Sequence, residues 1–329
     1  MSTHELTIRE AIREGIREEM AADERIFLMG ENVAGAGGIF KLTEGLLAEY
    51  GPSRVIDTPI SEEGFVGMAV GAALTGMRPI VEVMFIDFIT LAMDPIINQA
   101  AHIRYMTGGQ AKVPLTIRTT LGAGRSSAAQ HSQSLHAWFC HVPGLKVVLP
   151  STPYDAKGLI KTAIRDDNPV MFIEDKMMYD FKGPVPEETY TLPLGVADIK
   201  REGEDVTIVA TSSMVQEALK AADQLSEEGI HAEVIDPRTL VPLDKETLVH
   251  SARKTGRVIV VDEGYRSYGV TSELAMTILE EAFYYLICPI VRIGALDTPV
   301  PFSKPLEDAT IPSANQIVAA AKRLRSEQP

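Results

Sequence analysis

The alternation of short apolar runs with helical segments constrains the fold of this chain more than any other feature. The apolar runs have the length of β-strands, and helical segments lie between many of them. Strands that alternate with helices predict a mostly parallel sheet covered on both faces. The strand-like runs are residues 26–30, 54–59, 79–84, 113–120, 146–150 and 170–174, and the helical segments between them are residues 62–75, 88–106 and 153–165.

A second alternating block follows a proline-rich stretch of low periodicity, which contains GPVPEETYTLPLG. We therefore expect an α/β protein with two doubly wound, mostly parallel domains, residues 1–185 and 204–329, joined by a linker over residues 186–203. The chain opens with an amphipathic helix behind the capping-box pattern Thr7-Ile-Arg-Glu10. In the second block the expected strands are residues 206–211, 232–235 and 258–262, and the expected helices are residues 215–228 and 314–324.

The composition excludes several classes of protein. The chain has 329 residues, of which 45% are hydrophobic, so it can bury a sizeable core. Its formal net charge is −14. No basic block is present, which argues against a nucleic-acid partner. The two cysteines, Cys140 and Cys288, lack metal-ligand spacing and suit a reducing compartment. No signal core or membrane-length apolar run occurs, so we expect a soluble cytoplasmic protein.

The common cofactor and nucleophile motifs are missing. Gly122-Ala-Gly124-Arg-Ser-Ser127 follows a strand but has serine where a dinucleotide fingerprint needs its third glycine. No P-loop and no G-x-S-x-G elbow is present. His131 and His136 are five residues apart, whereas two zinc ligands on one helical face would be four apart.

Two stretches could carry chemistry. In DTPISEEGFVGMAVGAA, Glu62 and Glu63 precede an apolar, glycine-rich helix. One interpretation is an ordinary helix N-terminus, in which Ser61 caps the helix and the macrodipole stabilises both acids of the first turn. A functional role is compatible with that interpretation, because it requires only one of the two acids. In GAGRSSAAQHSQSLHAWF, a loop rich in glycine and serine delivers His131 before an apolar segment, and loops often carry function. A third stretch, VEVMFIDF, is typical of ordinary core.

These stretches, with others in the same order, resemble one family. It is the beta subunit of the thiamine-diphosphate-dependent first component of 2-oxoacid dehydrogenase complexes, which includes pyruvate, branched-chain and acetoin dehydrogenases. The matching segments cover nearly the whole chain and are DTPISEEGFVGMAVGAA, INQAAHIRYMTGG, AAQHSQS, PGLKVVLPSTPYDAKGLIKTAIRDDNPV, IDPRTLVPLD and TPVPFSKPLED.

The resemblance implies an assembly as well as a fold. The first domain would bind the aminopyrimidine of thiamine diphosphate, and the second would resemble the C-terminal domain of transketolase. The diphosphate and its Mg²⁺ would be held by a separate alpha subunit through a G-D-G…N pattern, and no G-D-G occurs in this chain. The implied assembly is an alpha2-beta2 heterotetramer with cofactors at alpha–beta interfaces.

The resemblance also assigns roles to residues. Glu62 would hydrogen-bond N1′ of the aminopyrimidine and so help to generate the reactive carbanion of the cofactor. Met84 and Phe88 would pack on the aminopyrimidine ring, which suits their size and apolarity. His131 would donate or accept protons near the reacting carbon atoms.

A structural potassium site is a further implication of the family. Its oxygen ligands would come from the backbone near Leu115, Ala163 and Asp166, with help from Asn168. The alternative interpretation is a helix C-terminus stopped by Asn168-Pro169.

The substrate stays open between members of the family. A beta subunit of this kind takes part either in decarboxylating a 2-oxoacid such as pyruvate or in cleaving acetoin, and the acyl group passes reductively to a lipoyl carrier. Segments such as MFIDFI and FIEDK are closer to the acetoin type. The sequence as a whole nevertheless favours acetoin and pyruvate about equally as substrates. The expected partners are the alpha subunit and the lipoyl and subunit-binding domains of the acyltransferase component. The alternative is a non-catalytic subunit that docks on the acyltransferase core.

Overall fold

The computed structural model describes residues 2–326 and divides them into two compact units. The first unit contains residues 2–121 and 138–194, and the second contains residues 122–137 and 195–326. The division near residue 195 falls inside the predicted linker. Residues 122–137 belong to the second unit, although we expected them in the first domain.

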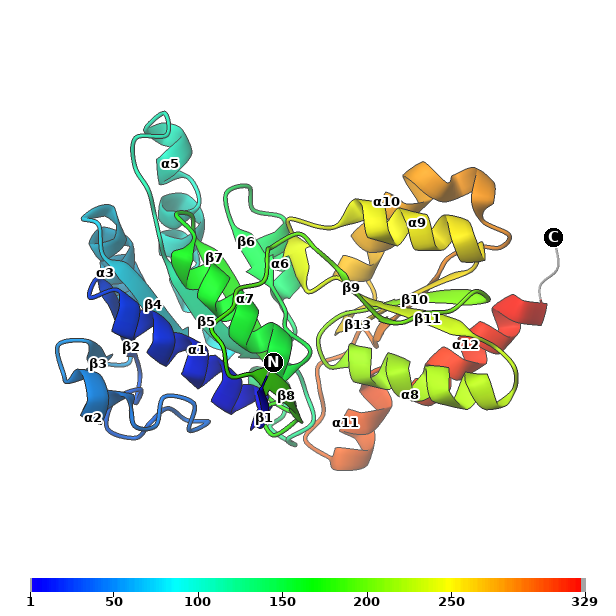
Figure 1. Cartoon of the computed structure of the whole chain (residues 1–329), viewed down its shortest axis with the longest axis horizontal. Helices are drawn as coiled ribbons and strands as arrows, with labels where there is room; N and C mark the ends of the chain where they lie inside the picture. Colours follow the sequence, from blue (N-terminus) through cyan, green and yellow to red (C-terminus); the bar gives the residue numbers. More distant parts are fainter. Residues whose placement is uncertain (1, 327–329) are drawn as a thin grey trace. The chain divides into compact units, whose positions relative to one another are not determined.

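The first unit contains a twisted parallel sheet in which six strands run in the order β6-β7-β5-β4-β2-β3 (Figure 1). Every neighbouring pair among these six strands is parallel. The strands are β2 (Ile26–Gly30), β3 (Val55–Asp57), β4 (Arg78–Val83), β5 (Thr116–Leu121), β6 (Lys146–Val148) and β7 (Val170–Asp175). The helices in this part of the sequence are α1 (Ile8–Ala22), α2 (Leu46–Tyr50), α3 (Glu62–Leu74), α4 (Ile86–Ile89), α5 (Ile103–Met106), α6 (His136–Cys140) and α7 (Pro153–Arg165).

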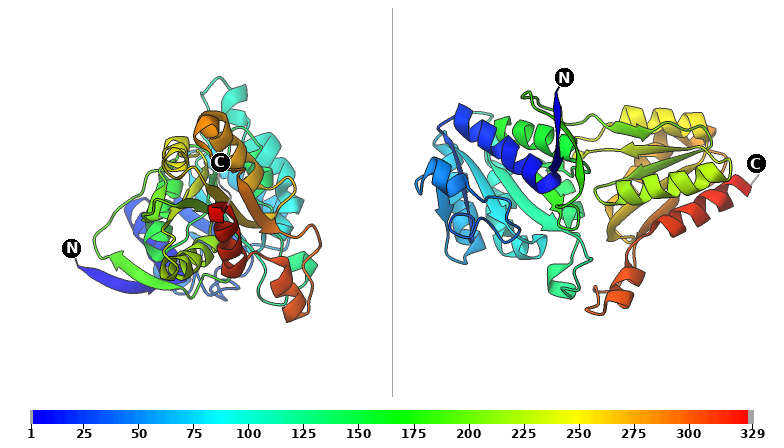
Figure 2. Two further views of the ribbon diagram at one scale, coloured as in Figure 1. Left: turned by 90° about the vertical axis from the view of Figure 1, so that its right-hand side faces the viewer. Right: turned by 60° about the horizontal axis from the view of Figure 1, so that its bottom comes forward.

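Helix α1 begins where the sequence predicts it. The Thr7 hydroxyl accepts the Glu10 N–H at 3.2 Å, and the Glu10 carboxylate accepts the Thr7 N–H at 2.9 Å, which completes the capping box. The apolar face of α1, which includes Ile12 and Ile16, is buried in one core with α7 and the sheet. Figure 2 shows α1 (blue) and α7 (green) side by side in its right-hand view. Burial of this face supplies most of the drive for docking the helix.

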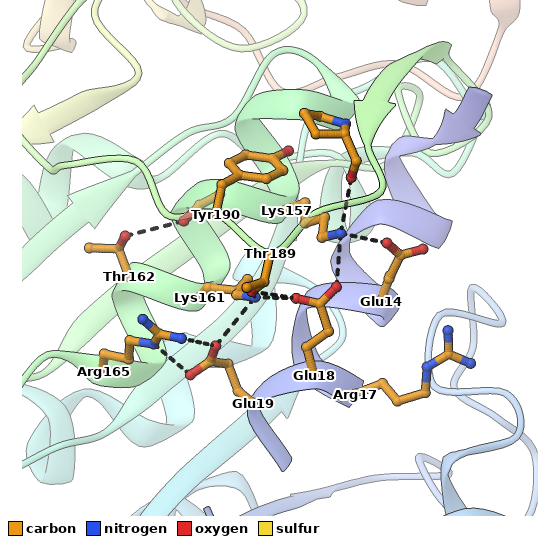
Figure 3. Close-up of polar contacts among 12 residues, drawn as sticks. Glu14, Arg17, Glu18, Glu19, Lys157, Lys161, Thr162, Arg165, Thr189 and Tyr190 are labelled. Atoms are coloured by element: carbon orange, nitrogen blue, oxygen red, sulfur yellow. Dashed lines mark hydrogen bonds and ion pairs between the residues drawn. The ribbon is translucent and has the colours of Figure 1, made fainter. Parts of the chain in front are cut away.

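A ladder of ion pairs joins α1 to α7 (Figure 3). Lys157 and Lys161 are almost fully buried, and both pair with Glu18 of α1. Burial raises the pKa of Glu18, but hydrogen bonds from the two lysines hold it below its ordinary value. The ladder consists of Glu14, Glu18 and Glu19 on α1 with Lys157, Lys161 and Arg165 on α7. The charges of the ladder pair with one another within the fold, so we interpret the ladder as structural and not as a binding site.

The second unit is a five-stranded sheet in the order β14-β13-β10-β11-β9. Its pairs are parallel except for the edge strand β9, which runs antiparallel to β11. Helices α8 and α12 pack on one face, and α9 and α10 pack on the other (Figure 1). The elements are β9 (Asp198–Arg201), β10 (Val206–Ala210), α8 (Met214–Glu227), β11 (Ala232–Asp236), β12 (Thr239–Val241), α9 (Lys245–Thr255), β13 (Val258–Tyr265), α10 (Val270–Ala282), β14 (Val291–Ala295), α11 (Lys304–Thr310) and α12 (Ala314–Ser326).

Two sequence-based expectations differ from the structure. Residues 88–106 do not form one helix but break into short α, 3₁₀ and π segments, with Pro95 starting the π segment at residues 95–100. Proline lacks the N–H that a continuous helix needs at that point. The predicted linker, residues 186–203, begins at the end of β8 (Lys182–Pro186), which pairs with β1 (Thr3–Thr7), and it contains strand β9, which joins the second sheet.

The predicted fold class is confirmed, since both units combine a mostly parallel sheet with helices. Within residues 2–326, none of the helices has the length and apolarity that crossing a membrane requires.

Candidate functional site

The first sheet has a reversal in its strand order that is typical of ligand sites. From β2 the chain moves outward to β3, then returns to place β4 on the other side of β2. In open parallel sheets, ligands bind outside the carboxyl ends of the strands at such a switch point. Glu31 directly follows β2, and Met84 directly follows β4, so both residues lie at this edge.

Glu62 is the first residue of α3, the helix that connects β3 to β4. Its side chain is buried, with 6% of the residue exposed, whereas the neighbouring Glu63 is exposed. No group among residues 2–326 donates a hydrogen bond to the Glu62 carboxylate or forms an ion pair with it. Ser61 at the N-cap makes no side-chain capping bond. Burying a carboxylate costs solvation free energy, and none of the residues that the structure describes offsets that cost with a hydrogen bond or an ion pair.

Glu31 is a second buried carboxyl group, which the sequence analysis missed. Burial and then the negative charge of Glu62 raise the pKa of Glu31, so the two side chains are close enough to interact. The Glu31 Oε1 atom is buried and has no hydrogen-bond partner in the part of the chain that the structure describes. The sequence signal that could have identified Glu31 is its position directly after the buried strand β2.

Met84 directly follows β4, and Phe88 lies four residues later on the short helix α4. Both side chains are half-buried. The Met84 carbonyl accepts the Thr120 hydroxyl at 2.7 Å, which ties the end of β4 to β5. Phe88 packs edge-on against Phe85, with ring centroids 5.6 Å apart. This places one thioether and one aromatic ring on the same edge as Glu31.

An arginine lies beneath this edge in a fully buried network. Arg118 on β5 donates to both oxygens of Glu174 at 2.8 and 2.7 Å and to Glu82 at 2.6 Å. The Tyr179 hydroxyl also donates to Glu174, at 2.5 Å. Burial raises the pKa of Glu174 more than the nearby Arg118 charge lowers it. Three members of this network, Glu82, Arg118 and Tyr179, line one small enclosed space together with Met84.

His131 lies in the second unit, on the segment formed by residues 122–137. It ends a single 3₁₀ turn, Ala129–His131, and is half-buried. The backbone leading to it is unusual, because Ser126 and Ala128 have φ values of 52° and 59°. Non-glycine residues adopt this left-handed region only when their surroundings hold them there.

Three carboxylates of the second unit hold this segment. The Ala123 N–H donates to Glu263 at 2.6 Å, and the Gly124 and Ser126 N–H groups donate to Glu307 at 2.8 and 3.0 Å. Glu307 is fully buried. The third carboxylate, Asp262, contacts a side chain near the other end of the segment.

That contact is a buried pair with His136. The His136 Nε2 atom lies 3.0 Å from one Asp262 oxygen and 3.1 Å from the other, and both residues are buried. Thr211 and the Gly264 N–H also donate to Asp262. Burial would raise the pKa of Asp262, but the His136 charge and these hydrogen bonds hold it below its ordinary value. His131 therefore lies on a segment anchored on both sides.

The residues of the predicted potassium site lie near the end of α7. Two of the oxygens proposed as ligands already accept bonds from cations. Arg78 Nη2 donates to the Asp166 carbonyl at 2.7 Å, and Arg104 Nη1 donates to Asn168 Oδ1 at 2.5 Å. Two guanidinium groups at these oxygens do not fit a K⁺ cage, so the geometry favours the alternative interpretation, a capped helix end. Among the described residues, no group of three or more His, Cys, Asp or Glu side chains is arranged to hold a metal ion.

Comparisons with known proteins agree with this architecture. Residues 4–182 match the family model described as transketolase, pyrimidine binding domain, and residues 195–317 match transketolase, C-terminal domain. Among solved structures, the chain is similar to a split-gene transketolase described as an inactive beta4 tetramer. The TM-score is 0.79 and the identity 27%, with 98% of this chain and 99% of that chain covered.

Curated relatives are similar over almost their full length. The acetoin:2,6-dichlorophenolindophenol oxidoreductase subunit beta of Bacillus subtilis is 50% identical, with 98% of each chain covered. The pyruvate dehydrogenase E1 component subunit beta of Rickettsia felis is 48% identical, with 97% of this chain and 98% of the relative covered. The chain belongs to the transketolase-like beta subunits of the first component of 2-oxoacid and acetoin dehydrogenases, which are oxidoreductases.

Proposed function

We propose that this chain, with an alpha subunit, forms a thiamine-diphosphate-dependent dehydrogenase in which Glu62 activates the aminopyrimidine of the cofactor. The substrate class is a 2-oxoacid such as pyruvate, or acetoin, and the acyl group is transferred reductively to a lipoyl carrier. Relatives named for pyruvate and relatives named for acetoin are almost equally similar to this chain, so both substrates stay in the proposal.

One observation carries the proposal: the buried Glu62 carboxylate has no partner among the described residues and lies on the helix that connects β3 to β4. A ring nitrogen that can carry a proton is the kind of group that would complete its hydrogen bonding. N1′ of the aminopyrimidine is such a group. Glu62 would share a proton with this atom, in surroundings that exclude water.

The neighbouring side chains fit a flat heteroaromatic ring. Met84 and Phe88 offer a polarisable thioether and an aromatic face at the carboxyl end of β4. They would hold the ring in place while Glu62 bonds its edge. When bound, thiamine diphosphate supplies a carbanion that adds to the carbonyl carbon of the substrate.

His131 has the second chemical role in the proposal. A half-buried imidazole on an anchored segment can donate and accept protons. We assign it proton transfer to and from oxygen atoms of the reacting substrate. The backbone anchors at Glu263 and Glu307 would keep the ring in position between turnovers.

A separate alpha subunit would complete the site. This chain contains no G-D-G sequence, so in the proposal the alpha subunit holds the diphosphate and Mg²⁺. Large apolar side chains of the first unit are exposed near Glu62, including Ile60 and Met68, which suits a protein interface. We propose an alpha2-beta2 heterotetramer that also engages the lipoyl and subunit-binding domains of an acyltransferase. A structural potassium ion is not part of this proposal, because Arg78 and Arg104 already donate hydrogen bonds to its expected oxygen ligands.

Dye reduction by the chain co-expressed with its alpha subunit tests the proposal. Thiamine diphosphate and Mg²⁺ would be present, and pyruvate, acetoin and a branched-chain 2-oxoacid would be compared in parallel. We expect turnover with pyruvate or acetoin that requires both chains. A stable heterotetramer that is inactive with all three substrates would instead support a non-catalytic assembly role.

A further inference from the structure

The second unit contains a basic pocket that plays no part in the proposed function. Its volume is about 400 Å³, and three arginines line it: Arg266 after β13, Arg292 on β14 and Arg323 on α12. None of the described residues that line it is acidic. Such a concentration of positive charge stands out in a chain with a net charge of −14.

Two of these guanidinium groups are not neutralised within the fold. Arg266 is exposed, and its side chain makes no ion pair with residues 2–326. Arg292 is half-buried and donates from Nη1 to the Ser272 hydroxyl at 2.5 Å and to the Arg266 carbonyl at 3.2 Å. These bonds orient Arg292 without cancelling its charge. By contrast Arg325, close by on α12, pairs with Asp205 at 3.3 Å.

The remaining wall is apolar and comes from Pro289, Ile290, Val291 and Leu324. The volume lies in the range of small-molecule sites, which is roughly 300–1,000 Å³, and exceeds what a single inorganic phosphate needs. Guanidinium groups match the geometry of phosphate oxygens and bond them in pairs. Several arginines on one pocket favour a ligand with more than one negative charge.

We propose that this pocket binds an organic di- or triphosphate of nucleotide size. Its phosphate groups lie against Arg266 and Arg292, and its organic body lies against the Pro289–Val291 wall. The inference is independent of the proposed dehydrogenase function, because the pocket shares no residue with the site around Glu62 or with the segment that carries His131.

Isothermal titration calorimetry on the full-length chain, without Mg²⁺, tests the inference with ATP, tripolyphosphate and citrate as probes. We expect one site per chain for ATP and for tripolyphosphate, with ATP at least as tight because of the apolar wall. Citrate should bind more weakly than either. If citrate bound as tightly as tripolyphosphate, the assignment of a phosphate ligand would be refuted. If tripolyphosphate bound more tightly than ATP, the proposed contact between an organic body and the apolar wall would be refuted.

Variants of the pocket arginines test whether ATP binds in this pocket. Arg266→Gln and Arg292→Gln should each weaken ATP binding by about tenfold, the effect of losing one charge-assisted contact. Lys245→Gln removes the same charge from an exposed position on α9, which packs on the opposite face of the sheet, and should leave binding unchanged. Arg266 is exposed, so its replacement should not disturb folding. Absence of binding, or ATP binding that is the same in Arg266→Gln as in the unchanged chain, would refute the inference.

Discussion

Replacing His136 by phenylalanine should destabilise the segment that carries His131. The His136 ring is 1% exposed and Asp262 is 2% exposed, so the pair is out of contact with water. Phenylalanine is similar in size, and the main loss is therefore the bond from Nε2 to the carboxylate. Hydrogen bonds to charged groups contribute roughly 1.5–3 kcal/mol. Breaking a buried ion pair costs roughly 3–5 kcal/mol, because a charge is left uncompensated.

The structure places this variant in the upper part of the first range. Asp262 keeps two donors, the Thr211 hydroxyl and the Gly264 N–H, so its charge is only partly uncovered. We expect a loss of about 2–3 kcal/mol in the free energy of unfolding. His136→Gln keeps an N–H donor and should lose less. Adding Asp262→Asn to His136→Phe should cost less than the sum of the two single changes, because the uncovered charge is gone.

Urea unfolding followed by tryptophan fluorescence measures this loss. Trp138 is the only tryptophan of the chain, is about half exposed and lies two residues after His136. The folded pKa of Asp262 is lowered, so its contribution is present at neutral pH and is lost as the pH falls below about 4. Equal stability of His136→Phe and the unchanged chain, with no coupling to Asp262→Asn, would refute the anchoring argument.

Two further predictions concern buried charges. Arg118→Met should lower the free energy of unfolding by about 3–5 kcal/mol, since it leaves Glu82 and Glu174 buried without their cation, and changing both glutamates to glutamine should restore most of it in denaturant titrations. The pKa of Glu31 is raised, so its ionised form is disfavoured in the folded chain, and its contribution to stability is lost as the pH rises through that pKa. Glu31→Gln cannot ionise, and it should therefore gain stability relative to the unchanged chain between pH 4 and 7. A constant difference across this range in thermal melts would contradict the raised pKa of Glu31.

The sequence predicted the elements whose side chains repeat with a clear period. The capping box at Thr7, the helix at Pro153–Arg165 and the strand at Ile26–Gly30 agree with the structure to the residue, because local patterning and burial act together there. The predicted helix over residues 88–106 was wrong because the break at Pro95 outweighs the apolar pattern.

What could not be predicted depends on contacts between residues far apart in the chain. Residues 122–137 join the second unit through Glu263 and Glu307, and nothing local to that segment indicates those partners. The same holds for the pair between His136 and Asp262. Glu31 was missed because a single acid after a strand is common, and only the strand order puts it near Glu62.

The role of Glu62 is the central claim, and the turnover of Glu62→Gln tests it most directly. The variant would be co-expressed with the alpha subunit, checked for assembly by size-exclusion chromatography, and compared with Glu63→Gln, which changes the exposed neighbour. Because acid–base steps contribute roughly 10²- to 10⁴-fold, Glu62→Gln should reduce dye reduction by a factor in that range while Glu63→Gln stays near the unchanged enzyme. An assembled Glu62→Gln enzyme with undiminished turnover would contradict the account.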